Sequence, residues 1–173
     1  IGYGINALRV AESRNQAESA LRRSEATLAR AQEIAHVGSW EWDLETDVVR
    51  WSQEAFHLFG FETGEVTPSL GLILERTHAD DRETLKQCMR EARGGWVSSV
   101  MCDHRILWED GTMRWIHMQA EVEFHDKGPY RVVGVLQDIS ERKRFEEKLS
   151  QLASHDALTG LPNRHLLNDR LEQ

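Results

Sequence analysis

The sequence has few of the residues and runs that simple functional sites require. Its two cysteines, Cys88 and Cys102, form no metal-binding or redox motif. We therefore expect reduced thiols in a cytoplasmic protein. No apolar run approaches the roughly 18 residues of a membrane span, and no signal peptide opens the chain. The sequence thus predicts no membrane contact from this segment.

The chain has no excess of positive charge, because 29 acidic residues outnumber 21 lysines and arginines. The formal net charge is −8 at pH 7, and the lysines and arginines are interleaved with acids, so no basic face is visible. This pattern excludes a nucleic-acid partner. The chain lacks a phosphate-cradling glycine loop, a nucleophile elbow and a zinc signature, so we expect no catalysis by these residues. The first residue is Ile1 and not methionine, which indicates a piece of a longer protein.

What the sequence does contain is a set of strand-like segments in its C-terminal half. Asp110 and Gly111 mark a hairpin turn, because glycine readily adopts the positive φ that a tight turn needs. Residues 113–124 alternate between apolar and polar side chains, which is the period of a half-buried strand. Together with strand-like runs at 100–108 and 130–139, they predict an antiparallel meander.

The segments upstream of the meander are two strands followed by three helices. They are expected at 39–44, 48–51, 53–59, 68–76 and 81–93. Ser52 is a candidate N-cap for the first helix, and Asp80 with Glu83 forms a capping-box pattern before the third. Strands at both ends with helices between them predict an α+β fold, a five-stranded antiparallel sheet with helices on one face.

Linker helices are expected on both sides of this core, at 1–36 and 141–154. Their apolar positions follow the 4-3 spacing of a coiled coil, so we predict a homodimer through these helices and the core. The residues of this predicted dimer seam are Leu21, Leu28, Ala31, Phe145, Leu149 and Leu152. The alternative is that the first helix is solvated and lies on its own domain.

Six short motifs occur in a specific order within the predicted core. They are Gly38-Ser39-Trp40-Glu41-Trp42-Asp43, Trp51-Ser52, Leu58-Phe59-Gly60, His78-Ala79-Asp80-Asp81-Arg82, Asp110-Gly111-Thr112 with Arg114-Trp115, and Val133-Gly134-Val135-Leu136-Gln137-Asp138-Ile139-Ser140. In this order and spacing, residues 37–140 resemble a PAS domain of the subtype that ends in a PAC motif. The resemblance implies a sensory module, which in many members holds a ligand between the sheet and the central helices.

Two further stretches resemble parts of other signalling domains. Residues 152–164, Leu-Ala-Ser-His-Asp-Ala-Leu-Thr-Gly-Leu-Pro-Asn-Arg, resemble the opening of a GGDEF domain, the diguanylate cyclase module, and residues 1–9 resemble the closing helix of a GAF domain. The catalytic loop of the cyclase family is absent from the sequence. The resemblance implies a parent chain that makes cyclic di-GMP from GTP, or one with a degenerate cyclase or a further phosphodiesterase domain.

The resulting domain division has four parts. It consists of a linker helix with a GAF-like beginning at 1–36, a PAS domain at 37–140, a second linker helix at 141–154 and the start of a GGDEF domain at 155–173.

One cluster of residues is a candidate ligand or metal site. If Asp110-Gly111 is a two-residue turn, His104 faces His117 across two strands, with Cys102 beside them. Two histidines this close could coordinate a shared metal ion or bind a haem. The favoured alternative is a pair of partly exposed histidines stacked on a sheet face. A one-residue bulge at the glycine would separate them.

Trp115 and Cys88 are further candidates for a ligand pocket. The six tryptophans raise the hypothesis of a flavin stacked among aromatic rings, although packing is the favoured interpretation. Cys88 is not in the Asn-Cys-Arg setting of photochemical PAS members, and helix 81–93 has no histidine of the kind that haem-binding members use. We therefore expect Cys88 in the core and no cofactor, with flavin or haem as alternatives.

Asp138, Ile139 and Ser140 form the joint where the last strand becomes the output helix. We predict that this joint transmits a signal from the core to a downstream domain, because weak helical seams can pair in more than one geometry. Two other interpretations stay open. One is a cofactor-bound redox or gas sensor, and the other is a structural spacer that only dimerises the output domain.

Overall fold

The computed structural model describes the backbone of residues 2–154 and the side chains of residues 14–150. The elements are α1 (Gly2–Ala35), β1 (Val37–Asp43), β2 (Val48–Trp51), α2 (Gln53–Leu58), α3 (Leu70–Arg76), a 3₁₀ turn η1 (Ala79–Asp81), α4 (Arg82–Gly94), β3 (Ser99–Leu107), β4 (Met113–His125), β5 (Gly128–Asp138) and α5 (Ser140–Ser154). The helices and strands predicted within residues 2–154 are present. The strand at 48–51 has the predicted bounds, and the other boundaries differ by at most two residues.

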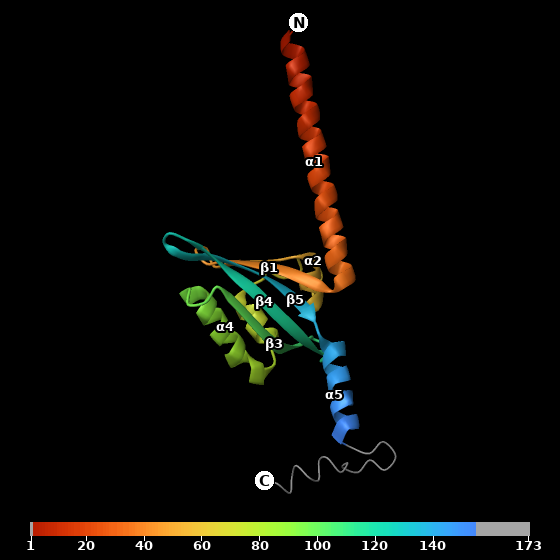
Figure 1. Ribbon diagram of the computed structural model, residues 1–173, viewed down its shortest axis with the longest axis vertical. Helices are drawn as coiled ribbons and strands as arrows, with labels where there is room; N and C mark the ends of the chain where they lie inside the picture. Colours follow the sequence, from red (N-terminus) through yellow and green to blue (C-terminus); the bar gives the residue numbers. More distant parts are fainter. Residues whose placement is uncertain (1, 155–173) are drawn as a thin grey trace.

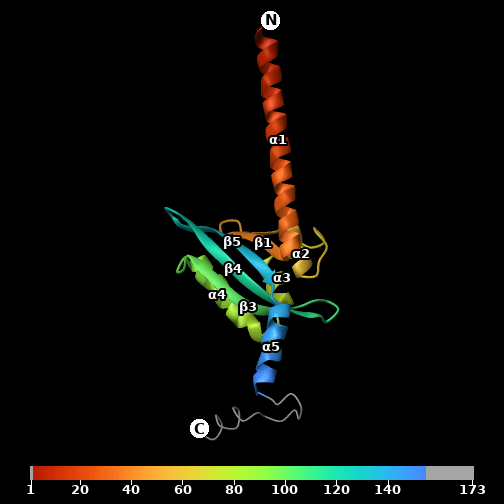
Figure 2. The ribbon, with the colours of Figure 1, turned by 45° about the vertical axis from the view of Figure 1, so that its right-hand side comes forward.

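The five strands form one antiparallel sheet in the order β2-β1-β5-β4-β3. Helices α2, α3 and α4 cover one face of it, which we call the inner face (Figures 1 and 2). On β4, Ile116, Met118 and Ala120 are buried on this face, while Trp115 and His117 alternate with them on the outer face. The predicted α+β fold is confirmed.

The hairpin between β3 and β4 has three loop residues instead of the predicted two. The amide of Trp108 donates to the carbonyl of Thr112 at 2.9 Å, and the amide of Gly111 donates back to the carbonyl of Trp108 at 3.1 Å. Gly111 adopts a φ of +82°, which glycine reaches without strain. The extra residue is the bulge that shifts the pairing of the two strands.

This shift separates the two histidines of the candidate metal site. His117 is paired with Asp103, and His104 is paired with Ile116. The predicted facing of His104 and His117 is therefore wrong, because a one-residue change of register moves a side chain to the opposite face of the sheet. His104 lies on the inner face and His117 on the outer face.

Two serines begin the short helices as expected from their chemistry. The Ser52 hydroxyl accepts the amide N–H of Ala55 at the start of α2, and the Ser69 hydroxyl accepts that of Leu72 at the start of α3. Each serine satisfies one of the amides that a helix start leaves without an intrahelical partner. The predicted Ser52 cap is confirmed.

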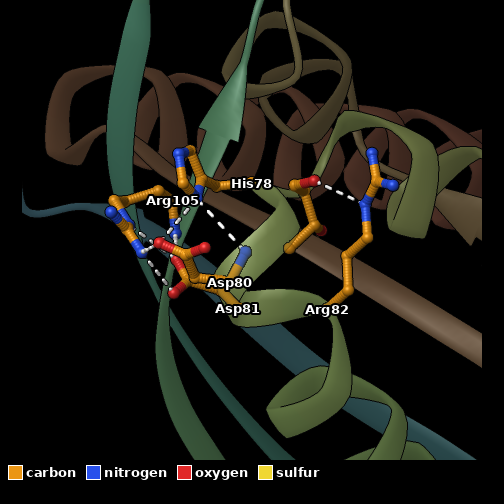
Figure 3. Close-up of polar contacts among 6 residues, drawn as sticks. His78, Asp80, Asp81, Arg82 and Arg105 are labelled. Atoms are coloured by element: carbon orange, nitrogen blue, oxygen red, sulfur yellow. Dashed lines mark hydrogen bonds and ion pairs between the residues drawn. The ribbon is translucent and has the colours of Figure 1, made fainter.

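The predicted capping box of Asp80 and Glu83 is wrong. Figure 3 shows Asp80 and Asp81 turned toward Arg105 of β3, and Arg105 Nη2 lies 2.7 Å from Asp81 Oδ1 and 3.2 Å from Asp80 Oδ2. A charged guanidinium fork is a stronger partner for these carboxylates than a neutral helix amide. His78 takes over the local cap, because its Nδ1 accepts the amide N–H of Asp80.

Helix α1 projects away from the sheet, and α5 leaves it in the opposite direction (Figure 1). Residues 14–31 of α1 are exposed, so the helix does not lie along its own domain. Within one chain the predicted dimer seam is uncovered: Leu21 and Leu28 are 60% exposed, and Phe145 and Leu149 are 64% and 66% exposed. Ala31 is also exposed.

Some predictions fall outside the described residues. These are the side chain of Leu152 and residues 155–173, which carry most of the stretch that resembles a GGDEF opening. Within residues 2–154, no helix combines the length and the apolar character needed to cross a bilayer.

Candidate functional site

A small apolar cavity lies between the inner face of the sheet and helices α3 and α4. Its walls are Trp40, Trp42, Trp51, Phe59, Leu70, Ile73, Met89, Ala92, His104, Met118 and Leu136. Its volume is about 20 Å³, which is room for about one water molecule. The cavity occupies the place where the PAS resemblance predicts a ligand.

Two of the residues that line this cavity each have a buried side-chain nitrogen without a hydrogen-bond partner. The two nitrogens are Nε1 of Trp40 and Nε2 of His104, and both side chains are at least nine-tenths buried. Burial lowers the pKa of His104 to about 4, so its ring is neutral at pH 7. A buried polar atom without a partner destabilises the fold, which makes these two atoms candidate contacts for a ligand or an ordered water.

The two cysteines lie beside this cavity. The thiol of Cys88 on α4 is within hydrogen-bonding reach of the thiol of Cys102 on β3, and Cys102 Sγ lies 3.8 Å from Nδ1 of His104. Burial and the neighbouring thiol of Cys88 raise the pKa of Cys102 to about 12, so it remains a neutral thiol. Both cysteines pack against the core, as predicted for Cys88.

The structure does not bring the candidate ligand residues together. His104 and Cys88 lie on the cavity side, while Trp115 and His117 lie on the outer face. Among residues 14–150, no group of three His, Cys, Asp or Glu side chains is arranged to hold a metal ion. A flavin or a haem does not fit this cavity, because sites for such ligands measure about 300–1,000 Å³.

The joint between β5 and α5 is held by the side chains that the sequence indicated. The Asp138 carboxylate accepts the amide N–H of Ser140 at 2.8 Å and a hydrogen bond from Arg114 Nη1 at 2.7 Å. Burial opposes the charge on Asp138, but Ser140 and Arg114 outweigh it and hold the pKa of the carboxyl below its usual value. Ile139 is buried, and the Ser140 hydroxyl accepts the amide N–H of Trp115 at 2.9 Å.

A second contact, which the sequence did not indicate, joins α5 to the outer face. Lys143 Nζ lies 3.1 Å from Asp103 Oδ2, and His117 Nδ1 lies 2.6 Å from Asp103 Oδ1. Burial opposes the charge on Asp103, but His117 and Lys143 outweigh it and lower the pKa of that carboxyl. Lys143 also sits 5.2 Å from the ring centroid of Trp115. No motif marks Asp103, because its partners become neighbours only when the sheet and α5 meet.

The end of α1 and the start of α5 line the same polar cleft, which has a volume of about 580 Å³. Glu33 and His36 line it from the α1 side, and Glu141 and Arg144 line it from α5. Glu54 of α2 is buried in its wall.

Within the cleft, contacts run from α1 toward α5. His36 Nδ1 lies 3.4 Å from Glu54 Oε1, which ties the end of α1 to α2. At the other end of α2, the carbonyl of Leu58 accepts the indole N–H of Trp108 at 3.0 Å. The guanidinium of Arg114 lies 4.2 Å from the centroid of the Trp108 ring, and Arg114 in turn binds Asp138 at the joint.

Known proteins share this architecture. The sensor protein FixL of Bradyrhizobium diazoefficiens is 32% identical over 124 residues, which are 69% of this chain and 23% of that protein. A sensory box histidine kinase/response regulator structure from Burkholderia thailandensis is 26% identical with a TM-score of 0.59, covering 69% of this chain and 89% of that one. The N-terminal domain of a diguanylate cyclase with a PAS/PAC sensor from Marinobacter aquaeolei shares the fold, at 24% identity and a TM-score of 0.55, covering 62% of this chain and 98% of that one.

The chain spans about a quarter or less of the length of the curated relatives it matches. The family described as the PAS fold matches residues 48–136, from β2 through most of β5. That match covers more than half of the sequence and includes the walls of the cavity on α3, α4 and β3. The chain therefore belongs to the PAS-fold family, and its core is a PAS sensory module of the kind found in signalling proteins.

Proposed function

We propose that this PAS module relays a conformational signal from helix α1 through the joint at Asp138, Ile139 and Ser140 to an output domain that follows α5. The observation that carries this proposal is the polar cleft, because its walls include the end of α1 and the start of α5. A change in how α1 meets α2 can alter the geometry at which α5 leaves the sheet. A shift of only ~1–3 kcal/mol between two arrangements changes the output several-fold.

The output domain that the sequence favours is a diguanylate cyclase, which makes cyclic di-GMP from GTP. The support is the resemblance of residues 152–164 to the opening of a GGDEF domain. The competing output is a histidine kinase, since the Burkholderia neighbour carries that name. The two outputs use different nucleotides, GTP and ATP, so assays of the purified parent chain with each nucleotide distinguish them.

The module acts as a homodimer in this proposal. The exposed seam residues Leu21 and Leu28 on α1, and Phe145 and Leu149 on α5, are spaced as coiled-coil positions that a second copy would cover. A weak seam suits a relay, because two loosely paired helices can change their pairing geometry.

The experiment is an assay of the purified full-length parent. Cyclic di-GMP formation from GTP without phosphate transfer from ATP to the protein supports the cyclase. Autophosphorylation by ATP without cyclic di-GMP contradicts it and assigns a kinase output. Sedimentation of the 173-residue chain as a monomer at every concentration tested would contradict the homodimer.

A further inference from the structure

The chain turns from α1 into the sheet at a single residue. Helix α1 ends at Ala35 and β1 begins at Val37, so His36 alone forms the connection. Its φ of +50° lies in the left-handed region, which few residues other than glycine adopt. The angle at which α1 leaves the domain therefore depends on the backbone of His36 and on the contacts that hold its side chain.

The side chain of His36 meets a buried carboxylate. Its Nδ1 lies 3.4 Å from Oε1 of Glu54, and the Glu54 side chain is only 10% exposed. Glu54 belongs to α2, which lies beside the end of α1 (Figure 2). From the other side, Nδ1 of His57 lies 3.5 Å from Oε2 of Glu54. Among residues 14–150, Glu54 forms no ion pair with a lysine or an arginine. The counter-charge of this carboxylate therefore depends on whether a histidine carries a proton.

The charges around Glu54 favour such a proton. The charged groups that line the cleft and the adjoining surface hollow are Arg30 and Glu33 of α1, Arg114 of β4, Asp138 of β5, and Glu141 and Arg144 of α5. Arg114 and Asp138 neutralise each other through their hydrogen bond of 2.7 Å. With Glu54 included, the other groups are three carboxylates and two guanidiniums, so the surroundings keep a negative charge that stabilises a protonated histidine.

The two histidines affect the end of α1 differently. His57 and Glu54 both belong to α2, so their contact does not join α1 to the domain, whereas the contact of His36 with Glu54 does. A hydrogen bond of 3.2 Å from Nε2 of Gln32 to the Ser39 hydroxyl also joins α1 to β1, but neither of its groups titrates. His36 follows the last turn of α1, where the helix carbonyls stabilise a cation. Of these contacts, the one made by His36 joins α1 to the domain with a strength that changes with pH.

We propose that protonation of His36 holds the end of α1 against Glu54 of α2, and that loss of this proton releases it. This inference rests on the proposed relay and names a regulator of its input, the proton concentration between about pH 6 and pH 8. With the proton bound, the contact is an ion pair and the connection at His36 keeps one angle between α1 and the sheet. Without the proton, a contact of 3.4 Å is a weak hydrogen bond, so α1 samples more angles.

The test follows amide hydrogen exchange in the last turn of α1, in the 173-residue chain at about pH 6 and about pH 8. The amide of His36 donates to the carbonyl of Glu33 at 3.2 Å and reports on this turn. After correction for the intrinsic effect of pH on exchange, protection should be about 3- to 10-fold higher at the lower pH, because Glu54 and the helix end both stabilise the protonated ring. Glu54→Gln, which keeps the shape of the side chain without its charge, should remove this difference.

The histidine variants assign the effect to one ring. His36→Asn should also remove the difference, since asparagine tolerates the left-handed backbone and does not titrate. The His36 side chain is 75% exposed, so this variant tests the proposal even where a change at the buried Glu54 prevents folding. His57→Gln should keep the difference, because it alters a contact within α2 only.

The matched control is His125→Gln. The side chains of His125 and His57 are both 41% exposed, and His125 Nε2 lies 3.4 Å from Oε1 of Glu45. Glu45 is an exposed carboxylate in the turn after β1, so its contact with His125 does not involve α1. The control should behave like the wild type.

Several results would overturn the proposal. Equal protection of the last turn at the two pH values in the wild type, or higher protection at the higher pH, is one such result. A difference that survives in Glu54→Gln or His36→Asn is another, and so is a difference that disappears in His57→Gln or His125→Gln. The relay itself is tested by the output of the parent chain at one fixed pH, so either proposal can fail while the other stands.

Discussion

Arg114 of β4 binds Asp138, the last residue of β5, through a hydrogen bond of 2.7 Å between Nη1 and Oδ2. The same carboxylate accepts the amide N–H of Ser140, the first residue of α5. Asp138 thus joins the sheet to helix α5, and Arg114 connects it to the ring of Trp108. The joint predicted from the sequence consists of these contacts, with Arg114 as the member that the prediction did not single out.

Asp138→Ala should loosen the start of α5 while leaving the core folded. The variant removes one charge-assisted hydrogen bond and the bond to the Ser140 amide, each of which contributes about 1–3 kcal/mol. We expect faster hydrogen exchange at the amides of α5, including that of Lys143, which donates to the carbonyl of Ile139 at 2.9 Å. The exchange of β4 amides should stay unchanged. Glu147→Ala, on the exposed surface of α5, is the control and should exchange like the wild type.

A second set of variants tests the contact between Asp103 and Lys143. Asp103→Asn and Lys143→Ala should show a coupling of about 0.5 kcal/mol in a double-mutant cycle of unfolding free energies, because the pair is partly exposed. Glu146→Gln is the matched control. Glu146 also contacts Lys143, but both residues belong to α5, so their contact does not join the helix to the sheet. Additive effects of the Asp103 and Lys143 substitutions would show that this contact does not anchor the helix.

Acid should destabilise the core through His104. Its pKa is about 4 in the folded chain and 6.5 ordinarily, so between these values only the unfolded chain takes up the proton. Stability from the neutral ring is therefore full above pH 6.5 and is lost as the pH falls toward 4. At pH 5 the loss is about 2 kcal/mol. Glutamine does not titrate, so between pH 7 and pH 5 the free energy of unfolding of His104→Gln should fall by about 2 kcal/mol less than that of the wild type. An identical fall in both proteins would refute the low pKa of His104.

The same substitution at two glycines should have opposite effects. A Cβ on Gly134 would stand 2.6 Å from the backbone oxygen of Gln119 and 2.7 Å from Trp40 Nε1, so Gly134→Ala should cost about 1–3 kcal/mol. Gly71 in α3 has its nearest neighbour at 3.8 Å, so Gly71→Ala should stabilise by about 0.5–1 kcal/mol. Thermal unfolding of the two variants checks both signs, and a tolerated Gly134→Ala would mean that the indole can move.

The sequence predicted the elements well because local signals specify them. Alternation on β4 identified its buried face, and Ser52 marked the start of α2. The register between β3 and β4 could not be predicted from such local signals. Asp110-Gly111 suits a two-residue turn and a three-residue loop equally, and only the closed structure decides between them.

The candidate site was harder to predict than the fold. The surroundings of Trp40 and His104 depend on how five strands and helices α3 and α4 pack, which no spacing in the sequence records. Asp103 and Lys143 lie 40 positions apart and meet only across the start of α5. The Asp138 joint was predictable because its residues are consecutive and belong to a recognisable motif.

The most direct test of the relay measures output of the purified parent chain in a double-mutant cycle. Leu28→Lys perturbs the input helix, where this side chain is 60% exposed, and Asp138→Ala perturbs the joint. We expect Leu28→Lys to change the rate of cyclic di-GMP formation several-fold in the wild-type background and to have no effect in the Asp138→Ala background. An equal effect of Leu28→Lys in both backgrounds would contradict the relay, because the signal would then reach the output domain without passing through Asp138.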